Sequence, residues 1–337
     1  MGRGAPVRTR LAPTPSGYAH IGNAANFVLC WLFARAQGGE VVLRIENVDR
    51  ARARPEFVNS LFADLAWLGL DWDLGPAGPE DHESPYVQSS SMRQARYREI
   101  LEDWKTRELC YPCNCTRRDL ALAAPQVQHL AEISGFGRPY PGTCRHRHPG
   151  EAGPHDAWRL RLPQKPDAFD DLWQERQELS DLRECGDPVI ARADGCFAYH
   201  LAVCADDIDQ GITHVLRGED LLPWSHLHRH IFGLLDGTPP AFGHHPLLGD
   251  AHGRRLSKSA GAESLAAMRR SGIRPEEVLG RLLPVLHPEM KWCEDAISLS
   301  ELLSLGAPFP ANGRMKPSVS RESTKPSQRA GATADGD

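Results

Sequence analysis

Hydrophobic and polar positions near the N-terminus predict a strand, a helix and a second strand, in that order. Residues 7–11 alternate between apolar and polar side chains ahead of a loop rich in Pro, Ser and Gly. Apolar residues then recur at helical spacing from residue 22 onward, and Gly38-Gly39 ends the helix before the apolar run 41–45. A strand, a helix and a parallel strand within about forty residues form the opening of a doubly wound α/β sheet.

Further helices and strands are predicted along the chain as far as residue 310. Pro55 begins an amphipathic helix with its apolar residues on one face, and Gly69 follows its end. Other helices are predicted at residues 92–109, 262–270 and 276–283, and other strands at 158–162, 189–205 and 212–217. From residue 311 onward the chain is rich in Ser, Lys, Arg, Pro, Gly and Ala, a composition typical of disordered tails.

This order of elements predicts a domain that is interrupted by an insert. We expect residues 1–100 and 189–250 to form one Rossmann-like catalytic domain, and residues 101–188 to form the insert. Residues 251–310 are expected to form a loop and a short helical segment, and residues 311–337 the tail.

Composition is ordinary for a globular protein, with 25% charged and 41% hydrophobic residues in a chain of 337. No apolar run reaches the roughly 18 residues that a membrane-spanning helix needs. The basic N-terminus leads into Pro13, Pro15 and Gly17 in place of an apolar signal core, and nine scattered cysteines fit a reducing compartment. We therefore expect a cytoplasmic monomer without a membrane partner. Because the net charge is −5, a nucleic-acid partner would need local basic patches.

The stretch His20-Ile21-Gly22-Asn23 lies where the first strand leads into a helix. A lone loop histidine is most often a surface residue. A helix N-terminus favours phosphate, however, because its amides are unpaired and its dipole attracts an anion. The second stretch, Arg255-Leu256-Ser257-Lys258-Ser259, places a lysine in a loop rich in Ser and Gly. Each stretch is weak evidence alone, but together and in this order they indicate a nucleotide-binding enzyme.

The two stretches resemble the signature motifs of class I aminoacyl-tRNA synthetases, although Asn23 stands where many members have a second histidine. Residues 10–23 and 44–49 are most similar to the glutamate branch. The resemblance implies ATP as a substrate together with Mg²⁺, His20 and Lys258 as catalytic residues, and an ATP site at His20, Gly22, Asn23 and Lys258. In that reaction the amino-acid carboxylate attacks the α-phosphate, so the protein contributes positioning and charge stabilisation.

The same resemblance implies a site for glutamate. A cation is needed against the side-chain carboxylate and an anion against the α-ammonium group. The positions that match the family are Arg10, Leu11, Ala12, Pro13, Thr14, Glu46, Tyr199 and Arg217.

A group of cysteines in the insert can form a metal site. Cys113-x-Cys115 and Tyr140-x₃-Cys144 supply ligands in two close pairs for a tetrahedral Zn²⁺. Cys110, His146 and His148 are alternative ligands, and reduced buried cysteines are the alternative to any metal site. The order Cys, Cys, Tyr, Cys resembles the zinc site of the glutamyl-queuosine tRNA(Asp) synthetases, which are truncated relatives of glutamyl-tRNA synthetase. That resemblance implies one structural Zn²⁺ held by Cys113, Cys115, Tyr140 and Cys144.

The function that the resemblance implies is ATP-dependent activation of glutamate and its transfer to queuosine in the anticodon arm of tRNA(Asp). Its alternatives are a glutamyl-tRNA synthetase that charges the tRNA 3′ end, and a catalytically silent synthetase-like module that binds RNA. The chain after Ser259 is short for a full synthetase, which favours the first reading. Candidate phosphate contacts in the insert are Arg117, Arg118, Arg145 and Arg147.

Overall fold

The computed structural model describes residues 6–123, 139–164, 168–247, 263–286 and 296–305. Its α-helices are α1 (Ile21–Arg35), α2 (Pro55–Leu68), α3 (Ser91–Thr106), α4 (Arg117–Ala123), α6 (Tyr199–Asp209), α7 (Trp224–Leu234), α8 (Leu265–Arg270), α9 (Pro275–Leu286) and α10 (Leu299–Ser304). Its strands are β1 (Arg8–Leu11), β2 (Glu40–Leu43), β3 (Cys110–Cys113), β4 (Ala157–Leu160), β5 (Phe169–Asp170), β6 (Arg176–Gln177), β7 (Val189–Ala191), β8 (His214–Gly218) and β9 (Ala241–His245).

Parallel strands form the centre of the molecule, as the sequence predicts. Strand β1 pairs in parallel with β2, and β8 pairs in parallel with β9. The amide of Thr213 donates to the carbonyl oxygen of Arg8 at 3.0 Å, which joins the start of β8 to β1. Helix α1 packs beside β1 and β2, and most of its residues are buried. The predicted β-α-β unit is thus confirmed.

Two glycines allow the chain to turn sharply around the first helices. A Cβ at Gly39 would lie 2.4 Å from the carbonyl oxygen of Val7, so only glycine fits between α1 and β2. Gly69 follows α2 with a left-handed φ of 76°, as expected for a helix C-terminus.

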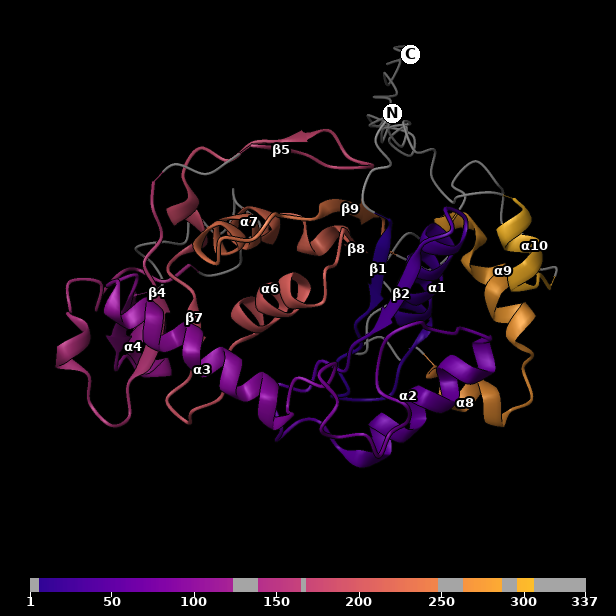
Figure 1. Cartoon of the computed structure of the whole chain (residues 1–337), viewed down its shortest axis with the longest axis horizontal. Coiled ribbons are helices and arrows are strands. Elements are labelled where there is room, and N and C mark those ends of the chain that lie inside the picture. Colours follow the sequence, from indigo (N-terminus) through magenta and orange to yellow (C-terminus); the bar gives the residue numbers. More distant parts are fainter. Residues whose placement is uncertain (1–5, 124–138, 165–167, 248–262, 287–295, 306–337) are drawn as a thin grey trace, which may run out of the picture.

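The part of the expected insert that contains α4 and β4 lies at one end of the molecule, and α9 and α10 lie at the other, while the β5 segment runs back towards β9 (Figure 1). In the insert, β4 pairs in antiparallel fashion with β3 on one side and β7 on the other. None of the helices in the described ranges is both long and apolar enough to cross a bilayer.

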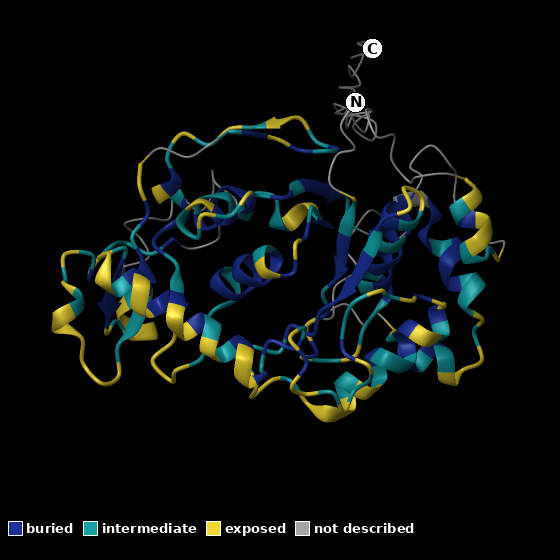
Figure 2. Ribbon diagram, in the orientation of Figure 1, coloured by how far each residue is buried: buried dark blue, intermediate teal, exposed yellow. Residues whose placement is uncertain are grey.

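One predicted strand is wrong. Residues 189–205 begin with the short strand β7, but from Tyr199 onward they form the helix α6. Seven consecutive residues of α6, from Leu201 to Asp207, are buried, and Figure 2 shows this helix in the interior. A helix buried on all sides lacks the polar face that produces a period of 3.6 residues, so its apolar run resembles a buried strand.

One predicted helix ends earlier than expected, and one prediction lies on residues that the structure does not describe. The helix expected at 92–109 ends at Thr106, because Cys110 to Cys113 pair with β4 as a strand. The predicted disordered tail, residues 311–337, lies outside the described residues.

Candidate active site

His20 occupies the N-cap position of α1. Its Nδ1 accepts a hydrogen bond from the amide of Gly22 at 3.1 Å, and its own amide donates to Oδ1 of Asn23 at 3.1 Å. A neutral imidazole that accepts at Nδ1 carries its proton on Nε2. The cap therefore makes Nε2 of His20 a donor, which is the role that a phosphate oxygen requires.

Gly22 is required by the position of this ring. A Cβ at residue 22 would lie 2.9 Å from Cε1 of His20, closer than side-chain carbons approach one another. The predicted ATP residues Gly22 and Asn23 thus both support His20: the glycine gives the ring space, and the asparagine holds its backbone.

Lys258 and its motif lie outside the described residues. The chain that follows the motif nevertheless returns to the first signature. Ser264 forms an isolated β-bridge with His20, and the amide of Leu265 donates to the carbonyl oxygen of Ala19 at 2.8 Å. Residues 264 and 265, which follow the second motif a few positions later in the sequence, therefore contact the first signature.

A cavity of 300 Å³ lies beside the loop after β1 and the first turn of α6. Thr14, Glu46 and Tyr199 line it, and these are three of the residues expected to bind glutamate. The backbone of this loop is fixed, because the amide of Glu46 donates to the carbonyl oxygen of Pro13 at 2.9 Å. Leu11 ends β1 and is fully buried, and Ala12 continues from it into the loop.

The four charged or phenolic residues of the predicted glutamate site lie close together. Burial, together with the charge of Glu46, raises the pKa of Tyr199 to about 12, and the charges of Arg217 and Arg10 oppose that shift. Arg10 also contacts a carboxylate, with Nε 3.4 Å from Oδ1 of Asp207. The structure therefore brings Arg10, Glu46, Tyr199 and Arg217 together, although the sequence separates them by up to two hundred residues.

Two neighbouring buried arginines differ in their partners. Arg44 contacts three carboxylates: Asp207 at 2.6 Å, Glu46 at 3.0 Å and Asp206 at 3.8 Å. Its charge is thus fully matched within the protein. Arg217 is also buried, but the hydrogen bonds that it makes in the described part of the chain reach only neutral acceptors.

Neutral partners surround the guanidinium of Arg217. Nε donates to Nε2 of His244 at 3.0 Å, Nη1 donates to Nδ1 of His228 at 2.9 Å, and Nη2 donates to Oγ of Ser225 at 2.7 Å and to the carbonyl oxygen of Leu221 at 3.2 Å. Burial lowers the pKa of Arg217, and that shift measures the cost of an unmatched buried cation. An arginine held in this way is a receptor for an anion.

The histidines around Arg217 are held neutral. Burial lowers the pKa of His244 to about 4 and that of His228 well below its usual value. Nδ1 of His244 donates to Oδ2 of Asp171 at 2.5 Å, which leaves Nε2 to accept from Arg217. Sequence reasoning missed Asp171, Ser225, His228 and His244, because nothing in the residue pattern relates Asp171 to a histidine 73 positions later.

The predicted zinc ligands converge in the insert. Within the described residues, Cys113, Cys115 and Cys144 form a group whose sulfur atoms all lie within 4.8 Å of one another. Oη of Tyr140 is 3.5 Å from the sulfur of Cys113 and 3.5 Å from that of Cys115. The sulfur atoms of Cys115 and Cys144 are 3.5 Å apart, close to the roughly 3.8 Å edge of a tetrahedron with Zn–S bonds of about 2.3 Å.

These distances fit one small divalent cation. The alternative ligands Cys110, His146 and His148 are not part of this group: Cys110 is buried in a separate hydrophobic cluster, and His148 bonds Glu108 at 2.8 Å. Arg159 contacts the cluster, since its Nε is 3.2 Å from the sulfur of Cys113 and its guanidinium lies 3.6 Å from the ring centroid of Tyr140. A nearby cation favours thiolate over thiol, and thiolate is the form that binds metal.

The four arginines proposed as phosphate contacts fall into two classes. Arg145 pairs with Asp187, and Arg147 pairs with Asp156 at 3.0 Å, so both hold the insert together. Arg117 and Arg118 are exposed on α4. The structure therefore favours α4 as the basic surface of the insert.

Comparisons with known proteins agree with the motifs and the fold. A family model described as tRNA synthetases class I (E and Q), catalytic domain, matches residues 6–285. A glutamyl-Q tRNA(Asp) synthetase from Nitratidesulfovibrio vulgaris is 43% identical over 284 residues, which cover 82% of this chain and 85% of the relative. Glutamate–tRNA ligase 1 from Nitrosococcus oceani is 35% identical over 303 residues, which cover 89% of this chain and 60% of the relative.

A solved structure shares the fold. The crystal structure of a glutamate-tRNA synthetase from Elizabethkingia anophelis superposes with a TM-score of 0.72 and covers 92% of this chain and 67% of its own, at 24% identity. Because the family model spans most of the chain and relatives above 40% identity match about four fifths of it, the assignment rests on sequence and fold alike. The chain belongs to the class I tRNA synthetases of the E and Q type, in the family of the glutamyl-Q tRNA(Asp) synthetases, and is a ligase of the aminoacyl-tRNA synthetase type.

Proposed function

We propose that this enzyme activates glutamate with ATP and transfers the glutamyl group to queuosine in the anticodon arm of tRNA(Asp). In the first step the α-carboxylate of glutamate attacks the α-phosphate of ATP, so that a glutamyl-adenylate forms and pyrophosphate leaves. In the second step a hydroxyl of queuosine attacks the glutamyl carbonyl carbon, and AMP leaves.

The proposal that the substrate is glutamate rests on the environment of Arg217. This residue is a buried cation with neutral hydrogen-bond partners, next to Tyr199 and Arg10. A second carboxylate on the substrate would match its charge, and a charge-assisted bond of this kind is about twice as strong as a neutral one. An amino acid with an uncharged side chain would leave the cation unmatched. In a buried site an unpaired charge of this kind costs on the order of several kcal/mol. Glu46, at the cavity beside Tyr199, is the group proposed for the α-ammonium.

His20 is proposed to bind ATP. The bond from the amide of Gly22 to Nδ1 places the ring proton on Nε2. This Nε2–H can donate to a phosphate oxygen and stabilise the negative charge that develops on the leaving pyrophosphate. Lys258 is proposed to supply the second cation for that charge. No protein nucleophile is required, so the residues act by orienting the two substrates and by stabilising charge.

Queuosine is proposed as the acceptor because relatives that are 43% and 44% identical to this chain carry the name glutamyl-Q tRNA(Asp) synthetase. Its cyclopentenediol has two neighbouring hydroxyls, like the terminal ribose of a tRNA. The same acyl-transfer geometry can therefore serve either acceptor. The second candidate, transfer to the tRNA 3′ end, is favoured by the 35% identity to a glutamate–tRNA ligase.

A single Zn²⁺ is proposed for the site formed by Cys113, Cys115, Tyr140 and Cys144. The close sulfur and phenol contacts support it. The site lies in the insert, away from Arg217 and His20, so its role is to stabilise the insert.

The test follows labelled glutamate. Enzyme, ATP and labelled glutamate are incubated with tRNA(Asp) that contains or lacks queuosine, each with an intact 3′ end or with the terminal nucleotide removed. The proposal expects label only on tRNA with queuosine, whether or not the 3′ nucleotide is present. Label that requires the 3′ nucleotide would assign the enzyme to 3′-end charging, and absence of glutamate-dependent pyrophosphate exchange would indicate a silent module.

A further inference from the structure

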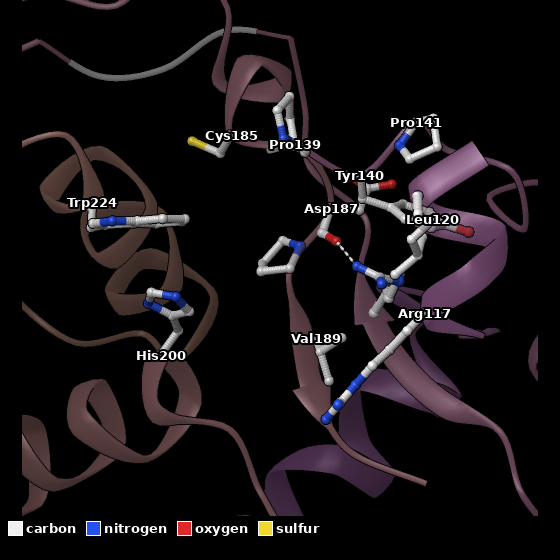
Figure 3. Close-up of a pocket in the computed structure, with 14 residues that line it drawn as sticks. Arg117, Leu120, Pro139, Tyr140, Pro141, Cys185, Asp187, Val189, His200 and Trp224 are labelled. Atoms are coloured by element: carbon white, nitrogen blue, oxygen red, sulfur yellow. Dashed lines mark hydrogen bonds between the residues drawn. The ribbon is translucent and has the colours of Figure 1, made fainter. Parts of the chain in front are cut away.

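A second and larger cavity lies between the insert and the helices α6 and α7. Its volume is 530 Å³, within the range of about 300–1,000 Å³ that is usual for small-ligand sites. His200 and Trp224 lie on one side of it, and Arg117, Tyr140 and Val189 lie on the other (Figure 3). We call this space the insert cavity.

The insert cavity is next to the cavity proposed for glutamate. Tyr199 lines the glutamate cavity and His200, the following residue, lines the insert cavity. His200 is also hydrogen-bonded through His228 to Arg217, the residue proposed to bind glutamate, so a molecule in the insert cavity would lie near that site. This position suits a part of the acceptor substrate.

The lining of the insert cavity combines flat apolar surfaces with cations. The rings of Trp224 and His200 are in contact in a tilted arrangement, with centroids 4.7 Å apart and an angle of 30° between their planes. Arg117 reaches the cavity from α4 on the opposite side. The carboxylate that lines it, Asp187, is paired with Arg145, so a cationic ligand finds no unmatched anion there. Flat rings beside an exposed arginine are the features that bind a nucleobase and its phosphate.

A chain of hydrogen bonds from Arg217 fixes the tautomer of His200. Arg217 can only donate, so Nδ1 of His228 accepts its bond and the proton of His228 is on Nε2. That proton is donated to Nδ1 of His200 at 3.0 Å, which places the proton of His200 on its Nε2. Burial lowers the pKa of His200 to about 4, so the ring stays neutral at pH 7. His200 thus offers a donor of fixed polarity at the cavity.

We infer that the insert cavity binds one nucleobase of the acceptor RNA, adjacent to the nucleoside that receives glutamate. Trp224 supplies the stacking surface, Nε2–H of His200 donates to the edge of the base, and Arg117 contacts its phosphate. The inference rests on the proposed function, since it names the part of the RNA that this enzyme holds while it transfers glutamate. The recognised base is a neighbour of the nucleoside that accepts glutamate. The enzyme can therefore distinguish between RNAs that contain the same accepting nucleoside.

The experiment couples a protein change to an RNA change. Trp224→Ala is compared with Trp224→Phe, which keeps an aromatic ring, on RNA that is intact or abasic at each neighbour of the accepting nucleoside. Glutamate-dependent pyrophosphate exchange without RNA is measured for every variant, and transfer is expressed relative to exchange. This ratio corrects for any loss of folded enzyme.

On intact RNA, Trp224→Ala is expected to lower relative transfer by about 5- to 150-fold, the loss that corresponds to one base stacked on an aromatic ring. Trp224→Phe is expected to lose much less. On RNA that is abasic at the bound position, wild type and Trp224→Ala should transfer equally slowly. Arg117→Ala should lower transfer more than Arg118→Ala, because Arg118 lies on the same helix but does not line the cavity.

The inference is overturned if Trp224→Ala loses the same factor on intact RNA, on RNA abasic at the 5′ neighbour and on RNA abasic at the 3′ neighbour, or if it loses nothing on intact RNA. Both results are distinct from failure of the proposed function. If wild type shows exchange but transfers glutamate to no RNA, the acceptor assignment fails. If wild type transfers glutamate normally but the effect of Trp224→Ala does not depend on the neighbouring base, only the nucleobase site is refuted.

Discussion

Asp171 is predicted to control glutamate binding although it is expected to touch no substrate. Its Oδ1 accepts from the amides of Trp173 and Gln174 at 3.0 Å each and from the amide of His244 at 3.2 Å. Its Oδ2 accepts from Nδ1 of His244 at 2.5 Å. In Asp171→Asn the three amides keep the remaining oxygen where it is, so the new amide nitrogen faces His244.

This substitution would reverse the polarity of the chain that ends at Arg217. The amide nitrogen donates to Nδ1 of His244, so the histidine proton moves to Nε2. Nε2–H of His244 would then face Nε–H of Arg217, so that both groups are donors. The two nitrogen atoms are 3.0 Å apart in the wild-type structure. Two donors repel one another, and Arg217 has to shift or lose this bond.

The magnitude follows from the cost of an unsatisfied buried polar group, about 1–3 kcal/mol. If Arg217 binds the substrate carboxylate, that cost appears as a rise of about 5- to 150-fold in KM for glutamate, while KM for ATP stays unchanged. Pyrophosphate exchange at varied glutamate and varied ATP measures both constants. The control is Asp170→Asn, because Asp170 is the adjacent residue and is an exposed partner of Arg176.

The outcome that refutes this reasoning is a folded Asp171→Asn enzyme with the same KM for glutamate as Asp170→Asn. Equal rises in KM for glutamate and for ATP would also contradict it, because they would indicate general damage to the fold. Circular dichroism and thermal unfolding of both variants provide the check on folding.

Three further predictions concern other parts of the molecule. Lys258→Ala is expected to slow glutamate-dependent exchange by about 10²- to 10³-fold with an unchanged circular dichroism spectrum, and unaltered exchange would remove Lys258 from the mechanism. Protein prepared without chelator is expected to contain one Zn²⁺ per chain and Cys115→Ala none; metal analysis of the wild type that finds no zinc would disprove the site. Because burial lowers the pKa of His200 and His244 from 6.5 to about 4, the unfolded chain takes up protons first as pH falls. The free energy of unfolding should therefore decrease between pH 6.5 and pH 4, by up to about 1.4 kcal/mol per pH unit for each histidine. Denaturant titrations of His200→Gln should show a less steep decrease.

The local parts of the active site could be predicted from the sequence. His20, Gly22 and Asn23 form one helix start, and their contacts span at most three residues. The cysteine pairs of the insert are similar, because the residue types and short spacings predict a candidate metal site before any folding is considered, although the choice of its ligands rests on the family resemblance. In both cases the chemistry is encoded within a few positions of the chain.

The surroundings of Arg217 could not be predicted in this way. Asp171, His228 and His244 belong to three separate elements, and their partners depend on how the strand β9 and the helix α7 pack. Histidines at 226, 228 and 230 occur on one helix, but the sequence does not say which of them turns towards Arg217. The strand predicted where α6 lies was wrong for a related reason: a segment buried on all sides has no polar face to show its period.

The capped start of α1 has a consequence for how the enzyme folds. The ring that is proposed to meet the phosphates is held by the first amides of the helix, and the glycine two positions later leaves room for it. If the helix started one turn earlier in the sequence, the amide of Gly22 would no longer be available to bond Nδ1 of His20. Before the helix forms, this amide is not in place to orient the ring. Formation of α1 therefore also orients the ring of His20, so an enzyme molecule with this helix formed already has the proton of this histidine on Nε2.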